Sequence, residues 1–381
     1  MKRVFFFIAI LFFACDAPAQ HLVKTGADQI TRVVKAIGKD RVALLVNHTA
    51  TVGKTHLVDT LLKHRVNVTC ILAPEHGFRG TADAGEIIAD GVDARSGLPV
   101  ISLYGSHKKP TPEQLRNVDA VVFDIQDVGA RFFTYISSLH YLMEACAEQQ
   151  KRVIVLDRPN PNGYVDGPVL QKELTSFIGM HPIPIAHGLT VGEIARMING
   201  EGWLKNGITC KLDVVPLQHW KHSDGYAVPV RPSPNLPNDN AIGWYASTCL
   251  FEGTVLSVGR GTLHPFEWIG HPKLTTYPFS FTPQSIDGMS KQPPHENTTC
   301  FGINLVDSVP PRGVTLKHLM RLYRDYPEKE TFFIPFFDKL AGTADLRKQI
   351  EAGMSEDEIR ATWQPALQTY LAMRKKYLLY P

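Results

Sequence analysis

Several motifs that assign a chain to a common class of enzyme are missing from this sequence. No G-x-G-x-x-G follows the first apolar segment, and neither G-x-S-x-G nor H-E-x-x-H occurs. A dinucleotide site, an α/β-hydrolase nucleophile and a zinc protease site therefore have no support. Gly53-Lys54-Thr55 resembles the end of a phosphate-binding loop, but His48 stands where that loop requires its first glycine.

The chain also has little net charge and few cysteines. A net charge of +3 is too small, and too evenly spread, to indicate nucleic acid or an anionic membrane as the partner. None of the 6 cysteines forms a C-x-x-C pair, so we expect mostly buried thiols and no zinc site. With 381 residues and a hydrophobic content of 44%, the chain is long enough for two domains.

The N-terminus has the pattern of an export signal. A basic pair precedes an apolar stretch, residues 4–13, that is too short to span a bilayer. Cleavage after Ala17-Pro18-Ala19 would remove residues 1–19, whereas cleavage before Cys15 would leave a lipid anchor on that cysteine. Phe12 fits a lipoprotein signal poorly, which favours the first site. In both cases we expect a periplasmic protein whose mature chain has no transmembrane segment.

Four short apolar segments in the first half of the chain each lead into a cluster of polar residues. The segments are Val42–Val46, Cys70–Ala73, Ala120–Phe123 and Val153–Leu156. Such runs, separated by helix-like stretches, are typical of buried strands in a parallel sheet. Because the carboxyl ends of parallel strands share one edge, where ligands bind, we expect the polar clusters to meet in one cleft. That convergence indicates an enzyme rather than a scaffold.

Helical patterns alternate with these segments up to about residue 215. The predicted helices are Thr55–His64, Pro112–Asn117, Arg131–Gln150 and Thr190–Glu201, the last opening with a capping box. This alternation predicts an α/β fold with a doubly wound, mostly parallel sheet.

The alternation of strands and helices ends at the proline-rich segment Val228–Asn240, whose four prolines exclude regular helix and central strand. A predicted strand, Cys300–Val306, and two predicted helices, Thr315–Arg324 and Glu356–Lys376, follow. We place a domain boundary near Thr262. It separates a catalytic domain, residues 22–262, from a smaller α+β domain, residues 263–381.

The turn after the second apolar segment carries the sharpest candidate for catalysis. Pro74 and Gly77 predict a tight turn that would hold Glu75 rigidly at the end of its strand. A carboxylate next to His76 and near Arg79 suits general acid–base chemistry. The alternative is that Glu75 and Arg79 pair only to fix the loop, but the position at a strand end favours function.

The third segment leads to two aspartates. Strand alternation sends Asp124 and Gln126 to the same side, which makes Asp124 a candidate catalytic carboxylate. Asp127 is equally well explained as a helix cap. Arg131 and Tyr135 follow one helical turn apart and are candidates for contact with a sugar or a carboxylate, although such a tyrosine is more often part of the core.

Other polar groups are candidates for substrate binding. Asn47 and His48 follow the first segment. Asp157, Arg158 and Asn160 form a rigid loop that either binds a ligand or contains a local ion pair. Ser233 and Asn235 have short side chains suited to sugar hydroxyls, and Glu252 and Arg260 flank a glycine-rich passage near the proposed boundary.

Taken in order, these motifs resemble those of the NamZ family of exo-β-N-acetylmuramidases, long catalogued as a domain of unknown function. The resemblance covers nearly all of the chain after the export signal. The matching blocks are Asn47-His48-Thr49, residues 74–80, residues 123–131, residues 157–161, residues 188–193, Ser233-Pro234-Asn235, residues 251–254 and residues 259–262.

The resemblance implies a Rossmann-like N-terminal domain, a smaller C-terminal domain and a cleft between them. It implies release of N-acetylmuramic acid from the non-reducing end of peptidoglycan-derived glycans, and it assigns the catalytic glutamate to Glu75. On chemistry alone, Asp124 or Glu252 would activate water, stabilise positive charge or act as nucleophile, unless the substrate's N-acetyl group assists. Arg79, Arg131 or Arg260 would pair with the lactyl carboxylate of muramic acid.

Two other functions stay open. One is a non-catalytic envelope protein that binds muropeptides. The other is a metal-dependent hydrolase or deacetylase that uses Asp124, Asp127, His48 and His76, although their spacing matches no common metal site. We expect no metal and no cofactor.

Overall fold

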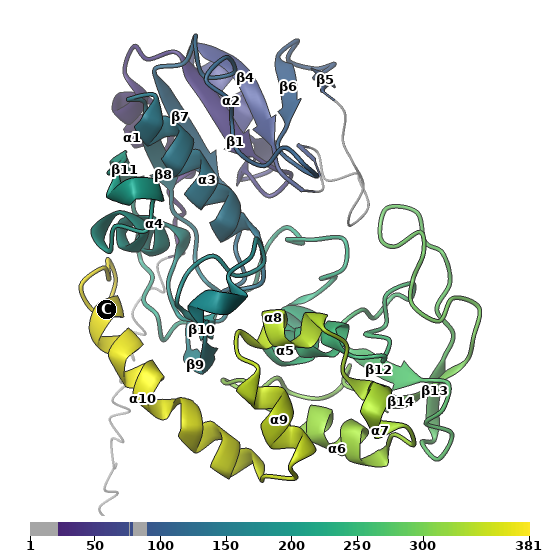
Figure 1. Ribbon diagram of the computed structural model, residues 1–381. Coiled ribbons are helices and arrows are strands. Elements are labelled where there is room, and N and C mark those ends of the chain that lie inside the picture. The colour runs from purple at the N-terminus through teal and green to yellow at the C-terminus, as the bar shows by residue number, and fades with distance from the viewer. Residues whose placement is uncertain (1–21, 76, 79–89) are drawn as a thin grey trace, which may run out of the picture.

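The computed structural model describes residues 22–75, 77–78 and 90–381. Within these residues, a seven-stranded sheet forms the centre of the N-terminal half, and a three-stranded sheet lies in the C-terminal part (Figure 1). The expected export signal, residues 1–19, lies outside the described residues. The strands of the main sheet are β1 (Val42–Val46), β4 (Val68–Ala73), β5 (Gly91–Val92), β6 (Pro99–Ser102), β7 (Ala120–Asp124), β8 (Arg152–Leu156) and β11 (Lys211–Val215).

The strand order of the main sheet is β11-β8-β7-β1-β4-β6-β5. In the described part of the chain every neighbouring pair is parallel except β5 with β6, which is antiparallel. Numbered along the chain, the parallel strands have the order 3-2-1-4-5-6, which is typical of Rossmann folds. The predicted doubly wound, mostly parallel sheet is confirmed, and all four predicted strands belong to it.

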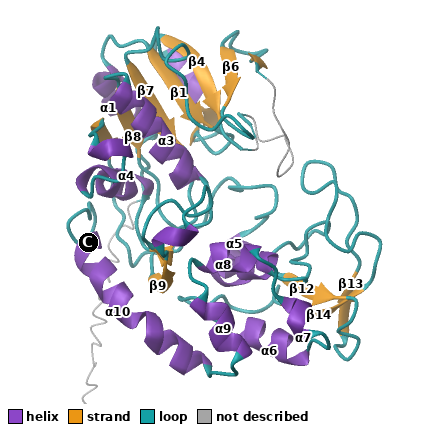
Figure 2. Ribbon diagram, in the orientation of Figure 1, coloured by secondary structure: helices purple, strands orange, loops and turns teal. Residues whose placement is uncertain are grey.

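Both faces of the sheet are covered by helices, which explains the continuous apolar runs. In β1, Ala43 and Leu45 belong to the core beneath α3 (Tyr135–Glu148) and α4 (Val191–Gly200), two helices that lie beside the main sheet (Figure 2). The other three residues of β1 pack with α1 (Ile30–Ile37) and α2 (Leu57–Lys63). Because a strand between two helical layers meets no water, it needs apolar side chains at every position.

Most predicted helices are present, with two differences. The capping box of α4 forms as expected, since the Thr190 hydroxyl accepts from the Glu193 amide and the Glu193 carboxylate accepts from the Thr190 amide. Helix α3 begins at Tyr135 rather than Arg131, because the Arg131 amide donates to Ile185 O at 2.8 Å and joins a neighbouring strand. The segment Pro112–Asn117 forms turns and no helix. A helix of so few residues gains too few hydrogen bonds to offset the free energy of nucleation.

The remaining strands form small sheets. Strands β9 (Val165–Val169) and β10 (Pro184–His187) pair antiparallel below the main sheet, and β2 (Thr51–Val52) pairs with β3 (Thr55–His56). The C-terminal sheet has the order β12-β14-β13. Its strands are β12 (Trp268–His271), β13 (Phe279–Phe281) and β14 (Cys300–Asn304).

Helices dominate the rest of the C-terminal part. No helix or strand forms in the proline-rich segment before α5, as predicted. The predicted C-terminal strand and helices correspond to β14, α6 and α10. The helices are α5 (Asp239–Thr248), α6 (Lys317–Asp325), α7 (Lys329–Phe332), α8 (Phe336–Ala341), α9 (Asp345–Glu351) and α10 (Glu356–Arg374).

Two further expectations concern cysteines and membrane helices. The five cysteines in the described residues are all free and buried, which confirms the expected buried thiols. Among the described helices, none combines the length and apolar character that crossing a bilayer requires.

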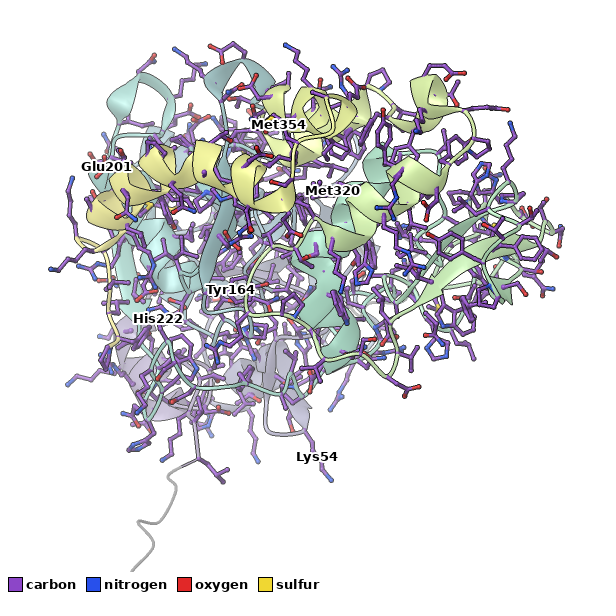
Figure 3. All side chains as sticks on the ribbon, turned by 90° about the horizontal axis from the view of Figure 1, so that it is seen from below. Lys54, Tyr164, Glu201, His222, Met320 and Met354 are labelled. Atoms are coloured by element: carbon purple, nitrogen blue, oxygen red, sulfur yellow. The ribbon has the colours of Figure 1, made fainter. Side chains whose placement is uncertain are left out.

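The end of the chain returns to the N-terminal half. Helix α10 runs back toward the N-terminal half, and Figure 3 shows Glu201 and His222 near the last residues of the chain. The Tyr380 hydroxyl donates to Asp157 Oδ2 at 2.6 Å, and the Leu379 amide donates to the Glu193 carboxylate at 2.8 Å. These bonds attach the C-terminus to the carboxyl end of β8 and to the first turn of α4.

Asp157 is fully buried beneath this contact, and burial raises its pKa to about 6. A raised pKa means that the folded state favours the protonated form. Stability is therefore lost as the pH rises from about 4, the ordinary pKa of aspartate, through 6.

We predict that Asp157→Asn folds and removes this loss. The asparagine amide would donate to the hydroxyls of Thr190 and Tyr380, which can accept as well as donate. Between pH 4 and 7 the unfolding free energy of the variant should rise relative to wild type by roughly 2 kcal/mol. Denaturant unfolding at both pH values measures this difference, and a difference independent of pH would contradict the prediction.

Candidate active site

A small pocket, with a volume of about 160 Å³, lies beyond the end of β4, between the two halves of the chain. Three groups of residues form its walls: the end of β4, the segment leading into α3, and the chain on both sides of α5. The polar lining residues are Glu75, Thr134, Tyr135, Ser233, Asn235, Tyr245, Glu252 and Arg260.

Glu75 is held at the end of β4 by the tight turn that the sequence predicts. The Gly77 amide donates to Pro74 O at 3.0 Å. Gly77 has φ +74°, a left-handed conformation that glycine adopts without strain. The turn leaves Glu75 half-buried, with its side chain in the wall of the pocket.

Both oxygens of the Glu75 carboxylate are held by neutral hydroxyl groups. The Tyr104 hydroxyl donates to Oε1 at 3.0 Å, and the Thr134 hydroxyl donates to Oε2 at 3.3 Å. The Tyr135 hydroxyl donates to the Glu75 backbone oxygen at 3.4 Å. Burial and the nearby charge of Glu75 raise the pKa of Tyr104, so its proton stays in this hydrogen bond.

Glu252 supplies a second carboxylate to the pocket and is paired with Arg260. It lies in the short 3₁₀ helix Cys249–Gly253 that follows α5. Arg260 Nε donates to Glu252 Oε1 at 2.6 Å, and the Cys249 thiol donates to Oε2 at 3.5 Å. Burial disfavours the charge of Arg260, but Glu252 outweighs it and the pKa of Arg260 is raised.

Aromatic rings in edge-to-face contact fix the shape of the pocket. Tyr245 lies 4.9 Å from Phe266 and 5.3 Å from Phe132, measured between ring centroids. Phe133 contacts Tyr135 at 5.0 Å. The Arg260 guanidinium lies 5.3 Å from the centroid of the Phe266 ring. Such contacts give the walls a defined position.

The proline-rich segment contributes Ser233 and Asn235 to the pocket. The Asn235 amide group donates to Met289 O at 2.8 Å, which fixes its orientation. Its Oδ1 is buried and has no hydrogen-bond donor among the described residues. An acceptor of this kind is suited to a ligand hydroxyl.

The structure places Asp124 outside the pocket, contrary to expectation. Asp124 is fully buried and forms a bidentate ion pair with Arg158, at 2.5 Å from Nε and 2.9 Å from Nη2. Arg158 also donates to Thr51 O at 3.2 Å. Both candidates are thus joined to each other and to the backbone, and neither lines the pocket.

Arg131 also lies away from the pocket, so it does not reach a ligand carboxylate there. It is 1% exposed and donates to three backbone oxygens, those of Pro168, Ile183 and Leu340, at 2.8 to 3.0 Å. Burial lowers its pKa to about 9. Arg131 joins the β9–β10 pair to α8.

Four further candidates are buried and form hydrogen bonds within the protein itself. Asp127 accepts from the Gly129 amide at 2.7 Å, although the turn it caps precedes α3 by several residues. Asn160 donates to Leu189 O at 3.0 Å. Asn47 accepts from Thr49, and Asp157 makes the contacts described above. None of these four lines the pocket.

Three candidates remain. His48 lines a neighbouring cavity and contacts Arg231 O at 2.7 Å. His76 and Arg79 lie outside the described residues. Within the described part of the chain, no group of three or more His, Cys, Asp or Glu side chains is arranged to hold a metal ion.

Sequence reasoning missed Tyr104, Thr134, Tyr245 and Cys249. Tyr104 follows β6 at the same edge of the sheet as Glu75, so recognition of β6 would have identified it. The short and partly exposed β6 lacks the apolar run that marked the other strands. Tyr245 and Cys249 lie in α5 and the 3₁₀ helix, where nothing in the pattern distinguishes them from core residues.

The arrangement defines a class of protein. Two carboxylates in one small pocket are typical of a glycoside hydrolase, and in this protein the pocket belongs to a two-domain α/β fold. Models of the N-terminal and C-terminal domains of exo-β-N-acetylmuramidase NamZ match residues 42–240 and 243–380. The chain belongs to this family and is a glycoside hydrolase. The domain boundary near Thr262 remains a prediction.

Similar proteins agree with this assignment. The chain is 39% identical to the peptidoglycan β-N-acetylmuramidase NamZ of Bacillus subtilis, over 94% of this chain and 91% of that protein. Two crystal structures of DUF1343 family proteins from Bacteroides fragilis each cover 94% of this chain and 99% of their own. They have 44% and 29% sequence identity to it and TM-scores of 0.88 and 0.79.

We predict that Tyr104→Phe lowers kcat roughly tenfold to a hundredfold, the cost of one hydrogen bond to a charged group. KM should change little, because Tyr104 holds Glu75 and does not line the pocket. Steady-state kinetics on a chromogenic aryl glycoside separate the two constants. Tyr141→Phe, in α3 and outside the pocket, is the matched control. A wild-type kcat in Tyr104→Phe would show that this bond has no effect on Glu75.

Proposed function

We propose that this protein releases N-acetylmuramic acid from the non-reducing end of peptidoglycan-derived glycans. The observation that carries the proposal is the position of Glu75, which is in the wall of the pocket at the end of β4 and shares that pocket with Glu252. The family to which the chain belongs and its similarity to the B. subtilis enzyme support it.

In this proposal Glu75 donates a proton to the glycosidic oxygen. A protonated Glu75 would carry the proton on Oε2, because the contact there is the longer of the two. The Thr134 hydroxyl can then accept instead of donate, so the carboxyl group keeps its position in both protonation states. Oε1 keeps its hydrogen bond from Tyr104.

Glu252 takes the second role, since the other candidate, Asp124, is sequestered by Arg158. It would stabilise the oxocarbenium-like charge, activate water or act as nucleophile. If the substrate's N-acetyl group attacks the anomeric carbon, Glu252 would orient it instead. Its bond to Arg260 holds the carboxylate in one orientation for any of these roles.

Arg260 is the residue best placed to recognise the lactyl carboxylate of muramic acid. It lines the pocket, and its Nε is used by Glu252. Among the described residues, its two Nη nitrogens have no hydrogen-bond acceptor. A guanidinium with two free nitrogens suits a carboxylate, which glucosamine lacks.

We also propose that the protein is exported to the periplasm. The basic pair and the short apolar stretch in residues 2–13 support this, as does a substrate that lies outside the cytoplasmic membrane. Cleavage after Ala19 would leave a protein without a lipid anchor, whereas cleavage before Cys15 would anchor it.

We predict that Glu75→Gln lowers kcat on an aryl N-acetylmuramide by about 10²–10⁴-fold, the usual contribution of a general acid. Glutamine has the same shape and cannot donate the proton. Glu296→Gln, an exposed glutamate outside the pocket, should keep wild-type activity. Thermal unfolding of both variants checks the fold. Near-wild-type turnover by folded Glu75→Gln would remove Glu75 from the mechanism.

The mode of attack gives a separate prediction. The proline-rich segment and the residues after α5 supply walls of the pocket, Leu236 and Phe266 among them, and we expect these walls to close it beyond one sugar. Glycans that end in muramic acid should lose one sugar at a time, while those capped by N-acetylglucosamine should stay intact. Proton NMR and mass spectrometry of the products distinguish these cases. Early internal fragments from intact peptidoglycan would mean that the pocket is open at both ends.

A further inference from the structure

A second cavity adjoins the pocket that contains Glu75. Ser233 lines both, so the two cavities are neighbours along the proline-rich segment. The second cavity has a volume of about 530 Å³. Its walls are His48, the residues around Arg231, and the turn at Asp287–Met289. It is large enough for a small ligand.

Three segments far apart in the sequence are tied together to form this cavity. His48 Nε2 contacts Arg231 O at 2.7 Å, which joins the end of β1 to the proline-rich segment. Asn235 Nδ2 donates to Met289 O at 2.8 Å, which joins that segment to the turn. The walls are therefore held in place by the protein itself and do not depend on a ligand.

Half of the residues that line the cavity are polar, and they carry both signs of charge. Arg231 and Asp287 are exposed in the cavity wall. Among the described residues, neither side chain forms an ion pair or a hydrogen bond. A guanidinium offers donors and a carboxylate offers acceptors, and neighbouring sugar hydroxyls can satisfy both.

We propose that this cavity binds the saccharide on the leaving side of the scissile bond. The inference rests on the proposed function, because an enzyme that removes one terminal sugar holds it in the pocket with Glu75. The rest of the glycan must then continue into adjoining space, and the cavity that shares Ser233 provides it. Its unpaired charged side chains, Arg231 and Asp287, suit the hydroxyl groups of an N-acetylglucosamine residue.

Two substrates test this assignment. An aryl N-acetylmuramide has no leaving saccharide, whereas a muramyl-glucosamine disaccharide has one. Arg231→Ala and Asp287→Asn should each lower kcat/KM on the disaccharide about tenfold, mainly through KM, as expected for a lost hydrogen bond to a charged group. On the aryl glycoside both variants should stay within about twofold of wild type, less than the loss of one such bond. Arg116→Ala, an exposed residue before β7 at the opposite edge of the sheet, is the matched control.

The outcomes separate this inference from the proposed function. Equal losses on both substrates, or no loss on the disaccharide, would overturn the leaving-group site while the hydrolase assignment stands. If the wild-type protein cleaves neither substrate, the proposed function fails and the inference fails with it. A selective loss on the disaccharide in both variants, with normal thermal unfolding, supports the assignment.

Discussion

The structure depends on the hydrogen-bond and charge partners of the polar residues at the carboxyl edge of the sheet. The clearest case is Asp124, at the end of β7, which is paired in two bonds with Arg158, just after β8. Both are buried beside β1, where the strand order of the sheet reverses. Since a buried charge without a partner costs several kcal/mol, removal of either residue would destabilise the edge on which the site is built.

This arrangement moves the site away from the point where Rossmann folds usually bind ligands. The crevice between β1 and β7 is filled by the protein's own side chains, and the pocket lies instead beyond β4. Glu75 comes from the sheet, whereas Glu252 and Arg260 follow α5. The pocket thus requires the two halves of the chain to keep their positions. Arg131 contributes to this, because its guanidinium bonds both the β9–β10 pair and α8.

The fold could be predicted because its strongest signals are local. Buried strands need continuous apolar runs, and the capping box of α4 marks its first turn, so both were found. The short strand β6 lacks such a signal and was not predicted. Helix α1 was overlooked although its apolar residues Ile30, Val33, Val34 and Ile37 fall at helical spacing. In the site, the turn at Glu75 was predictable from Pro74 and Gly77. The partners of Glu75 were not, because Tyr104 and Thr134 reach it only through the tertiary fold.

Glu75 and Asp124 show why a carboxylate at a strand end cannot be assigned a role from sequence. Both oxygens of Asp124 accept hydrogen bonds from the Arg158 guanidinium, so protonation of Asp124 would leave Arg158 buried without a partner. Among the described residues, the Glu75 carboxylate receives hydrogen bonds from hydroxyl groups alone, and a hydroxyl can reverse its hydrogen bond when the carboxyl group gains or loses a proton. A carboxylate at the end of a parallel strand is therefore structural in one case and chemically available in the other. The difference lies in the charge of the neighbours, which the tertiary fold alone brings together.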